Sequence, residues 1–475
     1  MQDSYRQLKE HWSIILVIVL SPLLLYAAIQ ILPTHDDWAG TTKPDFSAFF
    51  TKEHFLFYGY HWRPFDTWIG YIVGRNPQLL YPTFNHVLVI VGHVICSLLV
   101  YRLLKTLGFN STSCNIATFF FFIAPATMAT VLAVDSQNQT YALVWGIIAF
   151  LYYINNGRWK YFIWPFLIFM ATLSKENGLM WALICPILAF GFHFIDKRTL
   201  RKDLLIGISI MVVYALAILL LPKDIIIHPE YVPEDLKTVK NIVKFFFSTF
   251  ITVDYIYLLH QPSRNLLLAL ITLALSMPFF YYVFVKKFRL MTDRKMICTF
   301  IALIIAVGPH IATVFSMMHT YAGLALLSII IANSIHHYEQ LKFLFISFVF
   351  FVLSAIFIDT HLWYESWKSG LVGKNMSIEA IQKTGEPVNS VLVIIIEDDY
   401  PKLSSFCVIP NEAFGWGMAA QYETNYQWPK IIQDTTIVRS SDAMEKARRM
   451  ASEMLITDTI DCVWIVNHDK IDVVK

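Results

Sequence analysis

Long apolar runs alternate with short polar segments along most of this chain, and this alternation constrains the fold more than any single motif does. The runs lie at 13–32, 79–104, 114–134, 140–155, 161–173, 177–195, 204–221, 264–285, 296–316, 320–336 and 342–360. Several reach the roughly 20 residues that a helix needs to cross a bilayer core. The chain is also 56% hydrophobic and only 15% charged, which lies outside the range of soluble globular domains. The sequence therefore predicts an α-helical polytopic membrane protein with about 11 transmembrane helices.

Basic residues between the runs predict the orientation of the chain. They gather in short segments on the side of the N-terminus, namely Arg6 and Lys9, Arg102 and Lys105, Arg158 and Lys160, Lys197 to Lys202, Lys286 to Lys295, and Lys342. The positive-inside tendency places that side in the cytoplasm and the C-terminus outside. Segment 245–262 contains Asp254, and we interpret it as a helix in the outer interface or one that enters the membrane and returns. A net charge of +2 gives no indication of a nucleic-acid partner.

Hydropathy falls after Trp363, which indicates a change in the kind of structure. We expect residues 1–362 to form a transmembrane module whose first outer loop spans 33–78. Residues 374–475 have the pattern of a small soluble α/β domain, with strands at Val391–Ile396 and Val463–Val466 and a helix at Ala443–Leu455. With the orientation given above, this small domain is extracytoplasmic.

An acidic pair, Asp36 and Asp37, follows the first apolar run on the outer side. A carboxylate there could take a proton from an acceptor hydroxyl as the hydroxyl oxygen attacks an electrophilic carbon. Repulsion between the two carboxylates would raise the pKa of one of them. The pair could equally be a solvated segment after a helix. Its oxygens could also hold Mg²⁺ or Mn²⁺, but two acids without further partners make a weak metal site, so the sequence predicts no defined one.

The same outer loop contains an aromatic-rich segment with a single arginine, Arg63, between Trp62 and Pro64. Its guanidinium could clamp a phosphate with two parallel hydrogen bonds, or it could extend to lipid headgroups. His61 lies two positions before it and is a candidate supporting residue.

Three further outer segments carry candidate residues. Lys175 and Glu176 interrupt a long apolar stretch, and charges between two membrane segments favour a functional role, although a tight turn with a paired Lys and Glu would also fit. Asp135 lies in a short outer segment and could orient an acceptor or cap the next helix. His319, between two runs, could donate to a phosphate oxygen or anchor the chain at the interface.

In their order along the chain, these segments resemble those of a known enzyme superfamily. The acidic pair comes first, then Trp62-Arg63-Pro64, then the helical pattern that begins at Phe84-Asn85-His86, and then Leu173-Ser174-Lys175-Glu176-Asn177-Gly178. Over about residues 13–340 the chain resembles the GT-C superfamily of polytopic glycosyltransferases, and within it the protein O-mannosyltransferase-like branch.

The resemblance implies a sugar donor carried on a polyprenyl phosphate, used on the non-cytoplasmic face by an inverting displacement. The acceptor would be a lipid-linked glycan or a protein. Asp36 or Asp37 would act as the base, and Arg63, Lys175 and His319 would contact the donor phosphate. The supporting residues around the acceptor would be Asp135, Glu176 and His61.

The chain also departs from that branch. Ala124-Pro125 stands where the branch has His-Pro, and no acid follows before Asp135. A small α/β domain takes the place of TPR repeats, which favours a prokaryotic enzyme of the inner membrane. The competing functions are a transporter or flippase of lipid-linked glycans, a glycan polymerase or ligase, and a non-catalytic scaffold. A transporter would carry charged residues midway along its spans, whereas the polar residues here cluster at their outer ends.

Overall fold

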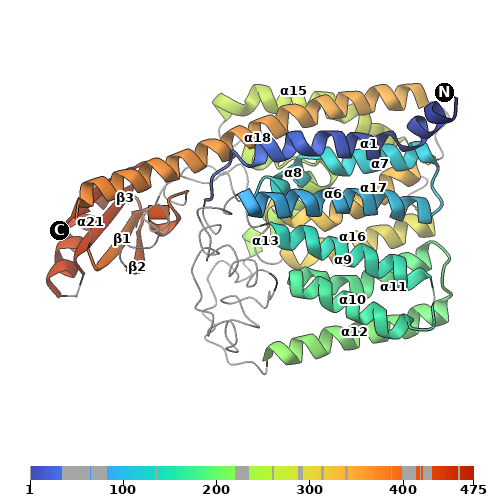
Figure 1. Cartoon of the computed structure of the whole chain (residues 1–475), viewed down its shortest axis with the longest axis horizontal. Coiled ribbons are helices and arrows are strands. Elements are labelled where there is room, and N and C mark those ends of the chain that lie inside the picture. Colours follow the sequence, from blue (N-terminus) through green and yellow to red (C-terminus); the bar gives the residue numbers. More distant parts are fainter. Residues whose placement is uncertain are drawn as a thin grey trace.

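The computed structural model describes residues 2–34, 65, 83–133, 136–155, 157–219, 235–258, 262–286, 292–311, 315–336, 341–386, 388–397, 413–417, 419–420, 430–457 and 460–475, and the structural statements below concern these residues. Most of them are helical, and the helices up to about residue 360 run side by side in one bundle (Figure 1). A four-stranded sheet near the C-terminus lies beyond one end of that bundle.

Each apolar run predicted from the sequence overlaps a helical segment. In chain order these are α1 (Gln2–Ala28), α6 (Thr83–Thr106), α7 (Ser111–Ile123) with α8 (Pro125–Val131), α9 (Gln137–Ile154), α10 (Lys160–Ser174), η2 (Glu176–Met180) with α11 (Trp181–Gly191), α12 (Lys197–Leu219), α15 (Pro262–Phe280) with η5 (Tyr281–Val285), α16 (Arg294–Ile311), η7 (Met317–Thr320) with α17 (Tyr321–His336), and α18 (Leu341–Thr384). Within the described part of the chain, six helices are long and apolar enough to span a membrane, or seven if the bent pair α7 and α8 is one span.

Proline explains the bend between α7 and α8, which is 51°. Pro125 occupies the first turn of α8, where its missing N–H costs no hydrogen bond, and it holds Ala124 in an extended conformation (φ −61°, ψ 132°). At the other end of α7, the side chain of Asn110 accepts a hydrogen bond from the backbone N–H of Ser113 at 2.8 Å. The two signals give α7 a fixed start and a fixed end.

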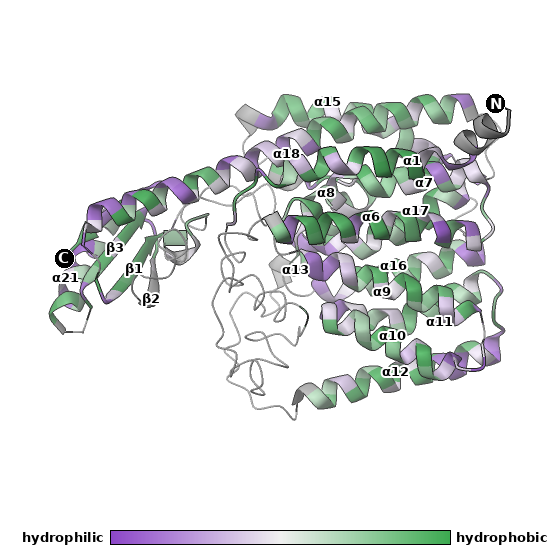
Figure 2. Ribbon diagram, in the orientation of Figure 1, coloured by the Kyte–Doolittle hydropathy of each residue, from purple (hydrophilic) through white to green (hydrophobic). Residues whose placement is uncertain are grey.

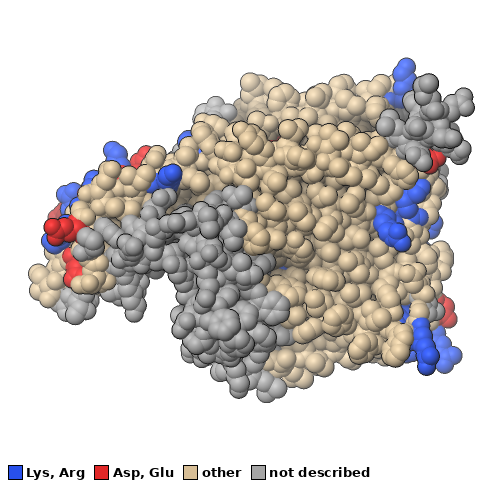
Figure 3. All heavy atoms as spheres, in the orientation of Figure 1, with Lys and Arg blue, Asp and Glu red and all other residues tan. Residues whose placement is uncertain are grey.

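The surface of the bundle is apolar along its length and charged at one end. Hydrophobic side chains cover the helix surfaces (Figure 2), and Leu23, Leu205 and Leu267 are each more than 60% exposed. Lys and Arg gather at the end of the bundle that also holds the N-terminus, and the middle of the same face carries neither (Figure 3). A belt of exposed apolar residues between polar ends is the pattern of a protein that sits in lipid.

Polar side chains inside the bundle form pairs that join helices. Ser13 Oγ of α1 donates to Asn115 Oδ1 of α7 at 2.7 Å, and His93 Nδ1 of α6 lies 2.9 Å from the Tyr321 hydroxyl of α17. Such interhelical hydrogen bonds stabilise packing where neighbouring apolar surfaces give little preference over lipid.

A buried ion pair joins α10 to α12 near the basic end of the bundle. Lys160 Nζ lies 3.1 Å from Asp203 Oδ2, with side chains 3% and 0% exposed. Tyr153 of α9 donates a hydrogen bond to the same carboxylate oxygen, and Lys160 Nζ lies 3.7 Å from the centre of the Tyr153 ring. Three helices therefore meet at one buried charge pair.

Removing that carboxylate is expected to destabilise the protein strongly. Asp203→Ala leaves the Lys160 ammonium buried without its counter-charge, which costs about 3 kcal/mol of unfolding free energy. Unfolding of the purified protein in detergent would measure it. Lys160→Met with Asp203→Leu should recover most of the loss, because an apolar pair needs no counter-charge. Asp196→Ala, which removes only an exposed hydrogen bond to Thr199, should cost much less than Asp203→Ala. Equal losses in Asp203→Ala and Asp196→Ala would contradict the assignment.

The segment around 245–262 is a broken helix. α13 (Asp235–Phe246) continues into the π-helical turn η4 (Phe247–Ile251), and the chain then turns at Thr252, whose φ of 64° lies in the left-handed region. A short helix, α14 (Tyr255–Leu258), follows. The interpretation of the segment as interfacial or re-entrant stays a prediction.

α18 connects the bundle to the C-terminal sheet without a break, so the change expected between residues 362 and 374 falls inside this helix. Trp363 Nε1 donates to the Ala27 carbonyl oxygen of α1 at 2.9 Å. Two turns further on, Gly370 packs so closely on Leu32 that a Cβ there would lie 2.8 Å from the Leu32 Cβ. α18 and the end of α1 are therefore held together where α18 leaves the bundle.

The C-terminal sheet has the strand order β2-β1-β3-β4. Its strands are β1 (Ser390–Ile396), β2 (Lys430–Ile437), β3 (Cys462–Asn467) and β4 (Lys470–Val474), and α21 (Ala443–Thr457) precedes β3. β1 pairs in parallel with β2 and β3, and β4 is antiparallel to β3. Strands β1 and β3 and helix α21 confirm the elements predicted at 391–396, 463–466 and 443–455.

Both faces of the sheet are covered by helices. Alternate residues of β1, such as Val393, share a hydrophobic cluster with Met376 and Ala380 of α18, while Ile394 shares one with Ala447 of α21. A strand buried on both faces has a continuous apolar sequence, which is why Ser390–Ile396 shows no polar alternation.

The parallel strands run back toward the bundle. Trp464 near the start of β3 donates to the Thr384 hydroxyl at the end of α18, at 2.9 Å. β1 and β3 therefore begin beside the far end of α18, and their carboxyl ends face the membrane helices.

Candidate active site

The residues selected from the sequence divide into two groups. The first group lies outside the described residues and consists of Asp36, Asp37, His61, Arg63 and Asp135. The second group is Lys175, Glu176 and His319, which the structure places in two turns, η2 and η7.

Lys175 sits in a tight, buried turn between α10 and α11. The residue is extended (φ −157°, ψ 145°) and only 4% exposed, and its carbonyl oxygen accepts from the Gly178 N–H at 2.8 Å. Its Nζ lies 3.5 Å from Asn138 Oδ1 in the first turn of α9. The next residue but one, Asn177, donates to Gln139 Oε1 at 3.4 Å. Two amides at the start of α9 therefore support the turn that carries the lysine.

Gly178 allows this turn to form. A Cβ at that position would lie 2.3 Å from the backbone C and O atoms of Ala171, and these atoms belong to α10, which cannot move aside locally. The close approach of η2 to α10 therefore requires glycine. The glycine fixes the position of the Lys175 backbone relative to α9.

Gly178→Ala is expected to displace the turn and lower the activity that depends on Lys175 by about tenfold, or about 1.4 kcal/mol. The thermal midpoint should fall as well, since backbone has to shift. Gly157→Ala is the matched control, because a Cβ there meets only the Tyr152 hydroxyl at 3.7 Å. Activity and thermal stability of Gly178→Ala equal to those of the control would refute the steric argument.

His319 lies in η7, a short helix between α16 and α17. Its Nδ1 accepts a hydrogen bond from the backbone N–H of Ser316 at 3.1 Å, so the proton of the neutral ring lies on Nε2. The ring stacks on His310 of α16, with centroids 4.1 Å apart and planes 8° apart. Thr130 of α8 donates to the Met318 carbonyl oxygen at 3.3 Å, which ties η7 to the bent span. The histidine ring is therefore fixed in orientation, with the proton of its neutral form on Nε2.

The two turns share a neighbouring helix, α16. η2 packs against α9 and α16, and η7 packs against α8, α13 and α16. Lys175 and His319 thus belong to one end of the bundle, the end opposite to the exposed basic residues of α6 and α12.

α13 contributes a polar face to the same end. Apart from Lys240, its exposed residues are apolar, with Val239 at 59% and Phe246 at 53%, whereas Asn241 and Lys244 are 4% and 5% exposed. Asn241 Nδ2 donates to the Ile311 carbonyl oxygen at the end of α16, at 3.0 Å. A helix that turns its polar side inward and its apolar side outward borders a polar interior and lies against lipid.

Three residues of this site were missed in the sequence analysis, namely Lys244, His310 and Asn138. Lys244 was visible as a signal, because Asn241, Lys244 and Ser248 recur at helical spacing within an apolar segment. His310 and Asn138 carry no such signal, since each comes to the site through the packing of helices distant in sequence.

Buried charged side chains gather at this end of the bundle. Lys175 and Lys244 are at most 5% exposed, and Asp254, which follows η4, is 1% exposed. Charged groups buried at the end of an apolar bundle mark a candidate functional site. Across the described ranges, no three His, Cys, Asp or Glu side chains come together in a way that could hold a metal ion.

No protein-family model matches this sequence, and no curated protein matches it either. Among solved structures, the chain is similar to ArnT from Cupriavidus metallidurans bound to undecaprenyl phosphate, with a TM-score of 0.52 and 10% sequence identity. The superposition covers 98% of this chain and 98% of ArnT. The protein is therefore a polytopic membrane protein with the fold of ArnT along its length, which confirms the α-helical membrane fold with a small C-terminal α/β domain expected from the sequence.

Proposed function

We propose that this protein is a membrane glycosyltransferase of the GT-C type that moves a sugar from a polyprenyl-phosphate donor to a lipid-linked glycan or protein on the non-cytoplasmic face. The observation that carries the proposal is the buried Lys175, whose ammonium lies beside the Asn138 amide of α9 at the end of an apolar bundle. A cation fixed there suits the phosphate of a lipid whose chain stays in the membrane. The fold shared with ArnT, a protein solved with undecaprenyl phosphate bound, supports the same class of donor.

The proposed orientation follows from charge. The exposed basic end of the bundle faces the cytoplasm, because short basic loops are retained there. The end with Lys175, Lys244 and His319, and the C-terminal sheet beyond it, then face outward. The membrane is the bacterial inner membrane in this proposal, and the O-mannosyltransferase-like branch stays a prediction.

The proposed mechanism is a single in-line displacement. Asp36 or Asp37 takes the proton of the acceptor hydroxyl, whose oxygen forms a bond to the anomeric carbon as the bond to the phosphate oxygen breaks. The phosphate leaves with the electron pair, and Lys175, Arg63 and His319 stabilise its charge. The anomeric configuration inverts because attack comes from the face opposite to the leaving group.

The supporting residues act on the acceptor side in this proposal. Asp135 immediately precedes the start of α9, whose Asn138 contacts Lys175, and Glu176 follows Lys175 in the same turn. His61 belongs to the same outer loop as the acidic pair. Each lies close in sequence to a residue assigned to the donor or to the base.

The C-terminal domain is proposed to cover the site and contact the acceptor. Ligands of open α/β sheets bind beyond the carboxyl ends of the strands, and those ends face the bundle. Arg439 lies there, with its guanidinium 3.0 Å from the Glu397 carbonyl oxygen and 3.1 Å from Asn467 Oδ1.

A transfer assay tests the proposed function. Membranes containing the protein would receive radiolabelled sugars on undecaprenyl phosphate or, in a parallel arm, on nucleotides. Label should move to a lipid-linked or protein acceptor from the lipid donors only. Movement of the intact lipid donor across the bilayer without sugar transfer would identify a flippase. Transfer from nucleotide sugars would overturn the proposed donor class.

A further inference from the structure

We infer that the basic end of the bundle carries a binding site for one anionic phospholipid, in the groove between α7 and α18. This site lies at the opposite end of the bundle from Lys175 and does not depend on the proposed function. The inference rests on the shape of the groove, on its apolar walls and on the positive charge at its rim.

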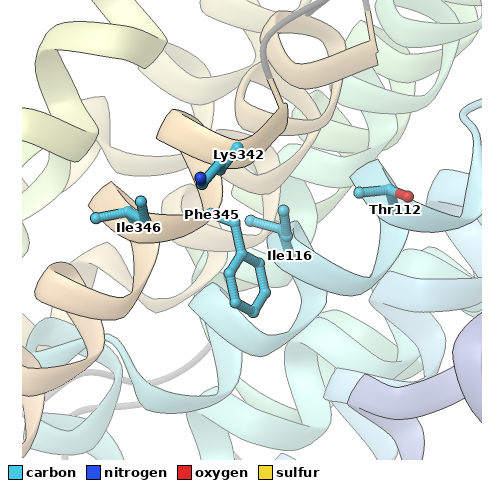
Figure 4. A pocket seen from close by; sticks show the side chains of 5 residues that line it. All are labelled: Thr112, Ile116, Lys342, Phe345 and Ile346. Carbon is cyan, nitrogen blue, oxygen red and sulfur yellow. The ribbon is translucent and has the colours of Figure 1, made fainter.

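The groove forms because two parallel helices separate toward their N-termini. α7 and α18 touch where Phe119 meets Phe348, with ring centroids 6.4 Å apart. Nearer to their first residues they part and leave a cavity of about 490 Å³, lined by Thr112, Ile116, Lys342, Phe345 and Ile346 (Figure 4). The rim residues Phe345 and Ile346 are 53% and 42% exposed. The cavity therefore opens on the lipid-facing side of the bundle and has room for a length of acyl chain.

The walls and the rim have different chemistry. Ile116, Phe345 and Ile346 form an apolar channel, completed by carbon atoms of Thr112 and of the Lys342 stem, while the Lys342 ammonium lies at its rim and the Thr112 hydroxyl points away from it (Figure 4). The apolar walls match the acyl chain of a phospholipid, and the single ammonium at the rim matches its phosphate. A soluble anion would gain nothing from the apolar part of the groove.

Positive charge at the rim comes from more than one source. Lys342 follows the first residue of α18, and Thr112 follows the first residue of α7, so two helix N-termini meet the groove together. Neither helix has an acidic residue in its first turn to neutralise the partial positive charge of its end. Lys105, which donates to the Ser111 hydroxyl at 3.2 Å, adds a second ammonium at the start of α7. A headgroup with a net negative charge is therefore favoured over a zwitterionic one.

Native mass spectrometry of the full chain in detergent tests the inference with two lipids of identical acyl chains, phosphatidylglycerol and phosphatidylcholine. We expect phosphatidylglycerol to bind more tightly, and Lys342→Ala to weaken it about fivefold, as expected for one lysine at a membrane surface. Ile346→Trp, which fills the groove and leaves the charge in place, should release the same lipid.

Two controls match these variants. Lys197→Ala removes an exposed lysine from the first position of α12, outside the groove at the same end of the bundle. Ile356→Trp enlarges another exposed residue of α18, 54% exposed and outside the groove. Both should bind phosphatidylglycerol as the wild type does. The inference is overturned if Lys342→Ala binds it like Lys197→Ala, or if phosphatidylcholine binds equally well and responds equally to Lys342→Ala.

Discussion

One of the two substitutions Asp36→Asn and Asp37→Asn is expected to lower sugar transfer by about 10²- to 10⁴-fold, the contribution typical of a positioned general base. The other should lower it by less, because a neighbouring carboxylate tunes the base without accepting the proton. Asparagine keeps the size and polarity of the side chain and removes only its basicity. Transfer from a radiolabelled undecaprenyl-phosphate sugar, normalised to the amount of protein in the membrane, is the measurement.

The control for this pair is Asp45→Asn, which removes a carboxylate from the same outer loop. It should leave transfer within about threefold of the wild type, since Asp45 is outside the acidic pair and is assigned no role in the step. The double variant Asp36→Asn with Asp37→Asn should be no slower than the worse single variant by more than about tenfold, because only one base acts in the step. Full transfer by the double variant would exclude the acidic pair as the base, and another group would then have to take the acceptor proton.

The sequence predicted the bundle well because the bilayer imposes a simple rule on it. A crossing helix has to be apolar over its whole length, so the apolar runs locate the helical segments from α1 to α18. The same rule fails at the ends of helices. Gln137, Asn138 and Gln139 lie between the apolar runs 114–134 and 140–155, yet they form the first turn of α9, where the amides of Asn138 and Gln139 contact the Lys175 turn.

The C-terminal sheet shows the same contrast between local and distant information. The apolar sequences of β1 and β3 were sufficient to predict both strands, since each is buried. β2 contains Gln433, Asp434, Thr435 and Thr436, and β4 has only five residues, so neither has a strong local signal. Their pairing to β1 and β3 forms them, and pairing is not visible in a single segment.

Only part of the candidate site could be predicted from the sequence, because local sequence does not show how helices pack. Charged residues between apolar runs are expensive unless they have a role, and this argument selected Lys175 and His319. The cost of burying charge does not identify the helices whose side chains contact Lys175 and His319. The stacking of His310 on His319 and the inward polar face of α13 depend on how α16 packs, which the sequence does not specify.

Lys175→Gln is expected to lower kcat/KM for the lipid donor by about 10²- to 10³-fold, the loss seen when a group that stabilises developing charge is removed. The lysine is buried and fixed near Asn138, so its charge is not screened by water as that of an exposed lysine would be. Lys175→Arg keeps the charge but not the compact geometry of the ammonium, so it should retain more activity than Lys175→Gln. Transfer at several donor concentrations separates the effect on kcat from the effect on KM.

A lysine that only held the turn together would behave differently. Its loss would lower the thermal midpoint and the amount of folded protein, and Lys175→Gln, which can still hydrogen-bond to Asn138, would then act like the wild type in transfer per folded molecule. Lys240→Gln, an exposed lysine of α13, controls for a general loss of positive charge at the same end of the bundle. If Lys175→Gln transfers sugar as fast as Lys240→Gln at equal stability, the donor phosphate does not bind at Lys175. A loss confined to Lys175→Gln, with an unchanged thermal midpoint, requires a charge that acts on the substrate, because no structural role predicts that combination.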